Sequence, residues 1–417
     1  GPEAPRWRRL MVSRLISFAG LLAIVGFAIL ISKDRKRISW RLVAWGVALQ
    51  IFFALIILCT APGLKLFEFA NLAFNKLYEF AGIGAGFLFG QTLTGLNDFV
   101  ILNIGATLVF VASLMSILFY LRVIPALVCA MARVMRATMR ASGAESLSAA
   151  MFVFMGIESV TGLKKYLKEM TTSELFTVMT GFMATIAGTV MAIYARVFGA
   201  SAGHLLAASI MSAPAAILIS KIMIPETGEP STCGSMDWGS VRSDDSNVIE
   251  AAASGAADGV KLAINIGAML LAFIALIGML DALLGYAGAP LGAELSFRKI
   301  SGYVFAPVAF IMGVPWSDCL EVGQLLGVKV IFNEFIAYQQ MQGMVAAGSL
   351  SPRSTTIATY ALCSFANFGS LAILIGGVAG LAQERKKEVA RLGLKALLAG
   401  FLAGCMTAAI AGALVNH

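Results

Sequence analysis

The chain has 417 residues, of which 59% are hydrophobic and 13% are charged, and its formal net charge is +8. Its mean hydropathy of +0.85 is too apolar for a soluble globular protein and is typical of a polytopic membrane protein. Basic loops beside a membrane account for the positive charge, so nucleic acid is not expected as a partner. The six cysteines show no CxxC spacing, which excludes the common zinc and redox motifs.

Residues 1–121 are predicted to hold three membrane spans and a helix that lies in the membrane interface. Leu64–Phe80 alternates polar and apolar residues at helical spacing, as interfacial helices do, and a glycine-rich link up to Gly90 is expected after it. The first apolar run is read as a span rather than a signal peptide, because no small-residue cleavage pattern follows it. The three runs of span length are Leu15–Ser32, Leu42–Thr60 and Ile101–Leu121.

Residues 122–224 are predicted to hold a re-entrant hairpin and the spans after it. The apolar run Leu147–Ile157 is only about half as long as a membrane span and closes at Glu158, so a hairpin that enters and leaves on one side fits it best. A capping box at Thr171–Glu174 then starts a helix. Polar and glycine residues interrupt that helix near Thr185.

Residues 298–380 repeat this order of elements. Two half-length apolar runs, Tyr303–Met312 and Val328–Tyr338, flank a breaker at Gly313–Trp316, and a later helix is interrupted at Phe365–Ser370. The rest of the chain is read as an aqueous loop, a long scaffold span and a final span, at residues 225–250, 251–297 and 381–417. The fold class is therefore an all-α membrane protein with about eight spans, two re-entrant hairpins and an interfacial helix.

Two carboxylates, Glu158 and Glu334, lie in the two predicted hairpins and are expected to be buried at membrane depth. An ionisable residue there costs roughly 2.5–3.5 kcal/mol, which marks it as a candidate functional residue. Paired, interrupted segments in the two halves of a chain indicate the binding site of a transporter built from an inverted repeat. The competing explanation is that Gly and Pro are simply common in membrane helices.

The basic residues predict an orientation in the membrane. Connections rich in Lys and Arg are expected on the cytoplasmic side, and eight spans would then place both termini outside. Arg6, Arg8 and Arg9 argue the other way for the N-terminus. The connections in question are 33–41, 122–140, 164–168 and 385–395.

Two other classes of function were considered. Residues Gly199–Gly203 match the GxSxG pattern of hydrolases and His204 follows, but the motif requires a strand-turn-helix elbow and here joins two spans. We therefore do not expect an enzyme, and replacing Ser201 by Ala should leave function unchanged. A passive channel would lack a closed, saturable site.

Several motifs resemble those of the concentrative nucleoside transporters, in particular bacterial members. Gly327-Val328-Lys329 followed by Asn333-Glu334-Phe335-Ile336-Ala337-Tyr338 is similar to the family signature GxKxxxNEFVAY. The resemblance extends in order along most of the chain, through Ala144–Ala150, Met223–Thr227, Gly313–Trp316 and Leu362–Asn367.

The resemblance implies cation-coupled uptake of nucleosides at the cytoplasmic (inner) membrane, by a homotrimer whose transport domain moves like an elevator. Glu334, Asn367 and Ser370 would bind the ribose, Phe365 would pack beside sugar and base, and Glu158 would face the base. Asn333, Val190, Gly156 and Ile157 complete the implied substrate site. A carboxylate such as Glu334 can accept hydrogen bonds from two adjacent hydroxyls; pairing with Lys329 or plain packing of Phe365 are the structural alternatives.

The first hairpin departs from the family pattern Asn-x-x-x-Gly-Gln-Thr-Glu-Ala-Pro. Gly156 and Ile157 replace the amide and hydroxyl that would read the base, so base recognition should be looser, water-mediated or directed at a different nucleoside-like solute. Met151 replaces an Asn, and a thioether is a poor ligand for sodium, which prefers oxygen. The implied coupling-ion positions are Met151, Phe154, Thr185 and Ile186. Thr185 still offers a hydroxyl, and backbone carbonyls near Phe154 and Ile186 could contribute, so the sodium site is weakened rather than excluded. We therefore favour a proton as the coupling ion, carried by Glu158 or Glu334, over sodium; no cofactor or firmly bound metal is expected.

Overall fold

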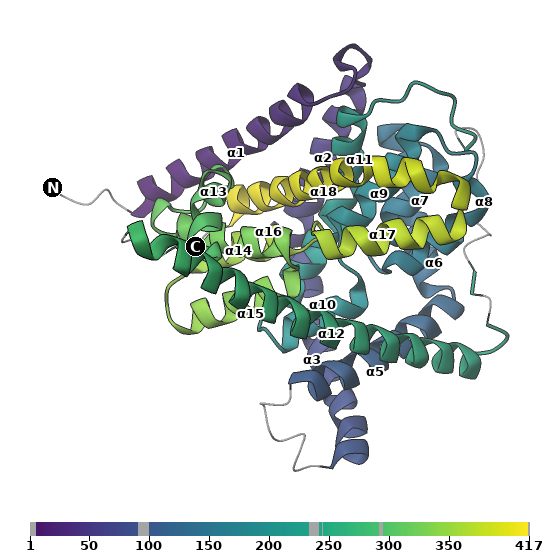
Figure 1. Cartoon of the computed structure of the whole chain (residues 1–417). Coiled ribbons are helices and arrows are strands. Elements are labelled where there is room, and N and C mark those ends of the chain that lie inside the picture. The colour runs from purple at the N-terminus through teal and green to yellow at the C-terminus, as the bar shows by residue number, and fades with distance from the viewer. Residues whose placement is uncertain (1–5, 91–99, 233–241, 244, 292–294, 416–417) are drawn as a thin grey trace.

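The computed structural model describes residues 6–90, 100–232, 242–243, 245–291 and 295–415, and every regular element within these ranges is helical (Figure 1). The predicted all-α class is thus confirmed. By length and composition, six helices of the described chain could cross a membrane, and a pair bent by 70° at Leu121–Arg122 would be a seventh. The expected eight spans remain a prediction.

The first quarter of the chain forms four helices, and one of them is longer than predicted. They are α1 (Arg6–Leu30), α2 (Trp40–Cys59), α3 (Ala61–Phe89) and α5 (Val100–Tyr120). The predicted glycine link after Phe80 is wrong, because α3 continues through it and ends only at Gly90, whose φ is +80°. A glycine costs a helix only about 1 kcal/mol, so a well-capped helix can continue until a residue takes positive φ.

The next segment forms the first hairpin and the helices around it. Capping boxes at Ser142/Glu145 and Thr171/Glu174 start α7 and α9. The descending limb of the hairpin ends at Met151, before the predicted Ile157, and the chain returns as a 3₁₀ turn. The elements are α6 (Val123–Met139), α7 (Gly143–Met151), η2 (Ile157–Leu163), α8 (Lys164–Leu167), α9 (Thr172–Ala184), α10 (Gly188–Arg196) and α11 (Ala202–Met223).

The second half repeats this order, with a correction to the predicted breaker. Gly313, with φ +92°, turns the chain between two antiparallel helices, and a further break at Phe332-Asn333 divides the run predicted over Val328–Tyr338. Asn333 causes the new start because its side chain accepts a hydrogen bond from Ile336 N. The helices are α12 (Val248–Gly288), α13 (Phe297–Ile311), α14 (Cys319–Ile331), α15 (Glu334–Ala346), α16 (Pro352–Leu362), α17 (Phe368–Leu381) and α18 (Lys386–Leu414).

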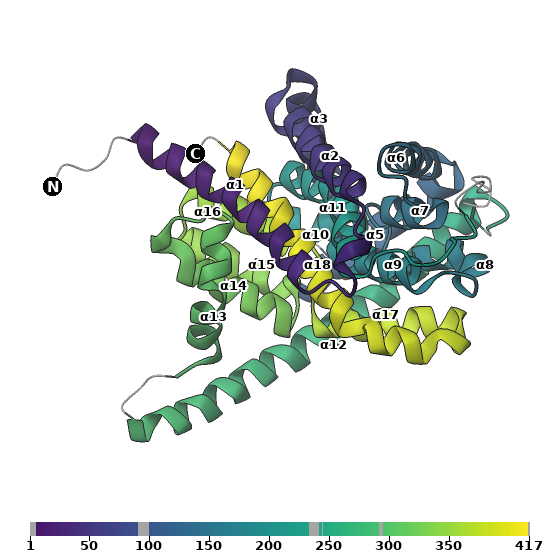
Figure 2. The ribbon, with the colours of Figure 1, turned by 90° about the horizontal axis from the view of Figure 1, so that it is seen from above.

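The core lies around α9, α11 and α18, which are almost entirely buried, whereas the 41-residue α12 is mostly exposed. Figures 1 and 2 show that α12 runs along the outside of the molecule. It packs on α5 through Gly255 and Gly259, where a Cβ atom would lie 2.6 Å from Ala112 O and from Val109 Cα. This close approach fixes which face of α12 turns inward.

The basic connections gather at one end of the molecule. Arg385 donates to Leu167 O and Lys168 O (3.2 Å each), which joins the connections 385–395 and 164–168. Lys33 N donates to Met223 O (2.9 Å) at the end of α11. Arg353 donates to Gly412 O near the C-terminus. The orientation in the membrane stays a prediction.

Candidate functional site

Three interruptions of the helical backbone meet inside the molecule. Phe365 N, in the break between α16 and α17, donates to Thr185 O in the break between α9 and α10 (3.1 Å). Gly188 N, just after that second break, donates to Phe154 O at the end of the first hairpin limb (3.1 Å). These two hydrogen bonds bring the break between α16 and α17, the break between α9 and α10, and the first hairpin into contact.

Glu334 lies beside this junction, at the first position of α15. Its Oε1 accepts from the Tyr194 hydroxyl (2.7 Å) and its Oε2 from Asn367 Nδ2 (2.7 Å). The residue is 5% exposed. The helix N-terminus and the two donors hold a negative charge in a fixed position.

A cavity of about 320 Å³ lies against Glu334 and is lined by most of the predicted substrate residues. Eight of the nine line it: Gly156, Ile157, Glu158, Val190, Asn333, Glu334, Phe365 and Ser370. Asn367 does not, because it is fully buried; its Oδ1 caps α17 by accepting from Ser370 N (2.7 Å). Phe365 faces the cavity and also packs on Phe182, with ring centroids 5.3 Å apart.

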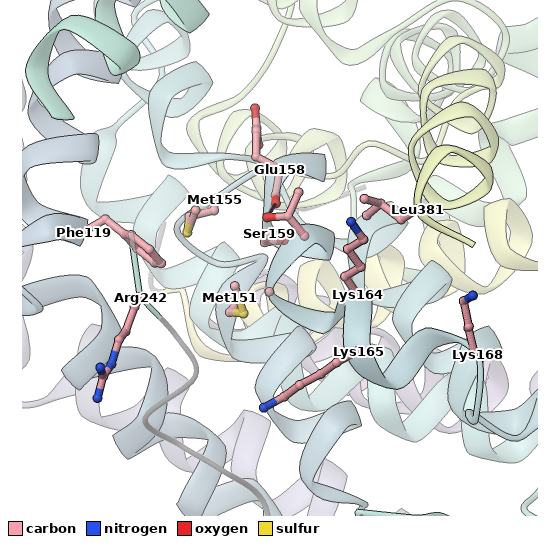
Figure 3. A pocket seen from close by; sticks show the side chains of 12 residues that line it. Phe119, Met151, Met155, Glu158, Ser159, Lys164, Lys165, Lys168, Arg242 and Leu381 are labelled. Atoms are coloured by element: carbon pink, nitrogen blue, oxygen red, sulfur yellow. Dashed lines mark hydrogen bonds between the residues drawn. The ribbon is translucent and has the colours of Figure 1, made fainter. Parts of the chain in front are cut away.

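Glu158 is exposed, which corrects the expectation that both carboxylates are buried. The hairpin returns through the 3₁₀ helix η2, in which Ser159 and Val160 are buried while Glu158 is exposed. Glu158 also lines a second, larger cavity of about 630 Å³ together with Lys164, Lys165 and Lys168 (Figure 3). It therefore lies where the two cavities meet.

Three polar residues of α12 also line the substrate cavity and were missed in the sequence. Asp258, Lys261 and Asn265 recur at spacings of three and four in an otherwise apolar helix. Spacings of three and four place the three residues on one face of the helix, and polar residues on one face of an apolar helix indicate a functional site. The sequence could therefore have indicated them. Tyr194 was missed as well, since its role depends on the fold bringing α10 to α15.

The proposed pairing of Glu334 with Lys329 is not among the ion pairs of the described residues. The Lys329 ammonium donates instead to Ala361 O and Ser364 Oγ, each at 2.6 Å. Lys329 is fully buried, so it ties α14 to the break between α16 and α17. Its role here is to fix the backbone beside the site.

The positions implied for a coupling ion offer one side-chain oxygen and the backbone carbonyls beside it. Thr185 provides the only side-chain oxygen among them, and its hydroxyl donates to Gly181 O (2.9 Å). The Met151 methyl group lies 3.1 Å from where a Cβ of Gly162 would be, so the thioether fills the space between the hairpin limbs. The Phe154 carbonyl is already an acceptor for Gly188 N. The Thr185 hydroxyl and the Phe154 carbonyl each keep a lone pair after these hydrogen bonds. The group thus has one side-chain oxygen, fewer than a hard cation prefers.

The hydrolase pattern has a structural explanation. Ser201 Oγ caps α11 by accepting from His204 N (3.5 Å). The His204 imidazole contacts the Tyr360 hydroxyl at 3.1 Å and stacks edge-on against Phe67. Neither side chain is arranged as a nucleophile with its base.

Comparison with known proteins identifies the family. Models described as "Na+ dependent nucleoside transporter N-terminus", "Nucleoside recognition" and "Na+ dependent nucleoside transporter C-terminus" match residues 19–92, 101–201 and 204–412. The chain is 39% identical to the uncharacterized transporter YutK of Bacillus subtilis, over 94% of this chain and 97% of that protein. It is 40% identical to solute carrier family 28 member 3 of Mus musculus, over 96% of this chain but only 59% of the mouse protein.

Solved structures agree in fold. The inward-facing, substrate-bound structure of CNTnw superposes with a TM-score of 0.89 at 36% identity and 97% coverage of both chains. An outward-facing variant of CNTnw gives 0.90 at 36% identity, covering 97% of this chain and 99% of that one. These relatives are transporters, which leaves the hydrolase reading without support. The chain belongs to the concentrative, or Na+ dependent, nucleoside transporter family.

Proposed function

We propose that the protein takes up nucleosides across the cytoplasmic membrane, driven by the gradient of a cation. The observation that carries this proposal is Glu334, held by Tyr194 and Asn367 at the edge of a cavity that Phe365 and Ser370 also line. The cavity volume of about 320 Å³ falls within the range of small-molecule sites, about 300–1,000 Å³.

The ribose binds to Glu334. Each carboxylate oxygen accepts one hydrogen bond from the protein and keeps a second acceptor position, so the pair can receive both hydroxyls of a cis-diol. Hydrogen bonds to an ionised group contribute about 1.5–3 kcal/mol each. Asn367 positions Glu334 from behind, the Ser370 hydroxyl completes the polar edge, and Phe365 packs on the sugar and base.

The base faces Gly156, Ile157, Val190 and Glu158, a wall that offers one polar side chain. Asn333 borders the ribose side, with its oxygen committed to capping α15. Because the base-facing wall differs from the family pattern, the alternative substrate is another ribosyl solute. Competition by unlabelled nucleosides for uptake distinguishes the two.

The coupling ion is a proton, in this proposal, because the Met151 thioether is a poor sodium ligand and Thr185 supplies one hydroxyl, which weakens a sodium site at these positions. Sodium is the alternative ion. Nucleosides are neutral, so a proton carried on Glu158 or Glu334 makes each cycle move one positive charge. Glu158 is accessible at the meeting of two cavities, whereas Glu334 is enclosed by its donors.

The architecture suits an elevator-type carrier with eight spans and two re-entrant hairpins. The two hairpins (α7 with η2 and α8; α14 with α15) and the two broken helices (α9/α10; α16/α17) surround the cavity as an inverted repeat would. α3 and α12 carry long exposed apolar faces, which suit a scaffold in contact with lipid and with the other subunits of a homotrimer.

The test is uptake of labelled nucleosides into proteoliposomes under a proton gradient alone or a sodium gradient alone. We expect saturable accumulation with the proton gradient and none with sodium. Accumulation that only sodium drives would overturn proton coupling, and failure of every nucleoside to accumulate or compete would overturn nucleoside transport.

The ribose assignment has its own test. Glu334→Gln should weaken binding of a nucleoside by roughly tenfold or more, because charge-assisted hydrogen bonds are lost. The same substitution should cost a 2′-deoxynucleoside less, since that ligand has only one of the two hydroxyls. Equal losses for both ligands, measured by calorimetry in detergent, would refute a contact with the diol.

A further inference from the structure

The wall of the substrate cavity that faces the first hairpin is polar, and it comes from α12. Asp258, Lys261 and Asn265 line this wall. Asp258 Oδ1 and Lys261 Nζ form an ion pair at 3.0 Å, with side-chain exposures of 62% and 74%. Both charges are therefore available to a molecule in the cavity.

The packing of α12 holds these groups toward the cavity. On another face of the helix, Gly255 and Gly259 lie against the α5 backbone, and Ser113 Oγ donates to Ala252 O (2.9 Å). A helix anchored this way cannot rotate without pushing backbone into backbone. The three polar residues are thus fixed by the contact with α5 and do not depend on the hairpins for their position.

The hairpin wall lacks the groups that would distinguish one base from another. Gly156 has no side chain and Ile157 is apolar, which leaves Glu158. Asp258 and Glu158 both line this cavity. Together, the walls present two carboxylates, one ammonium and one amide to the base.

An exposed ion pair on a helix surface is usually a solvated pair of little energetic consequence. The Asp258–Lys261 pair differs because both side chains line a cavity that Glu334 and Phe365 also line. A molecule in that cavity can therefore contact both charges.

We propose that α12 reads the nucleobase in this protein through Asp258, Lys261 and Asn265, in place of the first hairpin. The inference rests on the proposed nucleoside transport and names its substrate class: nucleosides whose base places a carbonyl oxygen beside N–H and amino donors, as guanine does. Lys261 donates to the carbonyl, the carboxylates accept from the ring N–H and the amino group, and Asn265 can do either. A base that turns an acceptor toward the carboxylates is disfavoured.

The test is competition of unlabelled guanosine, inosine and uridine against labelled guanosine uptake in proteoliposomes. In the wild-type protein, guanosine should compete about tenfold better than uridine, and inosine should be weaker than guanosine because it lacks the amino donor. Asp258→Asn and Lys261→Met should bring the guanosine-to-uridine ratio toward one. Glu79→Gln and Lys76→Met provide the control, because that pair has the same spacing and similar exposure on α3, outside the cavity.

The outcomes separate this inference from the function on which it rests. Nucleoside uptake without a preference for guanosine, or with a ratio that the α12 substitutions leave unchanged, overturns the inference alone. Absence of uptake of every nucleoside overturns the proposed function as well. If a charge substitution prevents folding, Asn265→Ala replaces it in the test, because this variant keeps both charges. Folding of each variant is checked by its elution as a single species in size-exclusion chromatography. An unaltered guanosine-to-uridine ratio in Asn265→Ala also counts against the proposal.

Discussion

At the scale of single residues, the site depends on side chains that position other side chains. Asn367 was expected to touch the sugar, but its oxygen caps α17 and its amide nitrogen holds Glu334. Tyr194 holds the other carboxylate oxygen. Three helices thus fix one carboxylate, and the direction of Glu334 is set before any substrate enters.

Removing the Tyr194 hydroxyl should loosen Glu334 without emptying the site. Tyr194→Phe keeps the ring that stacks on Tyr338, at 4.5 Å between centroids, and deletes only the hydrogen bond. We expect nucleoside affinity to fall about tenfold, since a hydrogen bond to a charged group contributes about 1.5–3 kcal/mol. Binding measured by calorimetry in detergent checks this.

Tyr338→Phe is the matched control for that measurement. Its hydroxyl is equally buried but donates to Thr359 O (2.7 Å), away from Glu334. It should lower thermal stability and leave affinity unchanged. If both variants bind equally well, Tyr194 does not position the carboxylate.

At the scale of elements, glycines decide how closely helices approach. Gly259→Ala would place a methyl group 2.6 Å from Val109 Cα, so α12 must separate from α5. Overpacking of this kind costs about 1–3 kcal/mol. We expect a lower midpoint of thermal unfolding in detergent.

Gly278→Ala on the same helix is the control, because nothing lies within 4 Å of the added methyl group. Its unfolding midpoint should equal that of the wild type or exceed it slightly. Equal midpoints for the Gly259 and Gly278 variants would show that α12 is not anchored through its glycines.

A charged cluster joins α7, α9 and α11 at the basic end of the molecule. Lys221 Nζ lies 2.5 Å from Glu145 Oε1 and 2.9 Å from Glu226 Oε2, and Thr171 Oγ1 donates to Glu226 (2.9 Å). Partial burial acts to raise the pKa of Glu226, but the Lys221 ammonium and these hydrogen bonds outweigh it, so the pKa lies below its ordinary value.

The sign of that shift predicts acid lability. A carboxyl whose pKa is lower in the folded state stabilises the protein above its unfolded pKa, about 4.3, and loses this contribution as pH falls through the folded value. Thermal unfolding between pH 7 and pH 3.5 should show a decline below about pH 4.5 that Glu226→Gln reduces. An identical pH profile for the variant would contradict this role.

At the scale of the whole molecule, the burial pattern separates a compact part from an outer one. α9, α11 and α18 are enclosed, whereas α3 and α12 expose large apolar side chains such as Leu72, Phe87 and Leu271. The cavity lies between the compact part and α12, so movement of one against the other would open and close it.

The homotrimer proposed for this family member predicts a mass of three times 43.9 kDa. Native mass spectrometry from detergent measures it, since bound detergent is removed in the gas phase. Ile83→Asp, on the exposed apolar face of α3 (71% exposed), should favour the monomer because a buried charge in an interface is costly. A wild-type monomer would exclude the trimer.

The sequence by itself indicated that the protein lies in a membrane, that its fold is all-α and which family it belongs to. The lengths of the apolar runs and the signature around Glu334 are local patterns, so they can be recognised without knowledge of the tertiary structure. It also indicated half-length segments in each half of the chain, but the runs Tyr303–Met312 and Val328–Tyr338 do not coincide with α14 and α15. It misplaced the break at Asn333 and the end of α3, since a cap or a terminating glycine competes with apolar runs that continue across it.

Only the tertiary structure decided which groups meet. It buried Glu334 between Tyr194 and Asn367, left Glu158 exposed in the lining of both cavities, and placed Asp258, Lys261 and Asn265 in the lining of the smaller one. These contacts join residues 33 to 140 positions apart, and they depend on packing between helices that no local pattern encodes. The physical reason is that burial and hydrogen bonding are properties of the assembled fold, whereas hydropathy and capping belong to short stretches of chain.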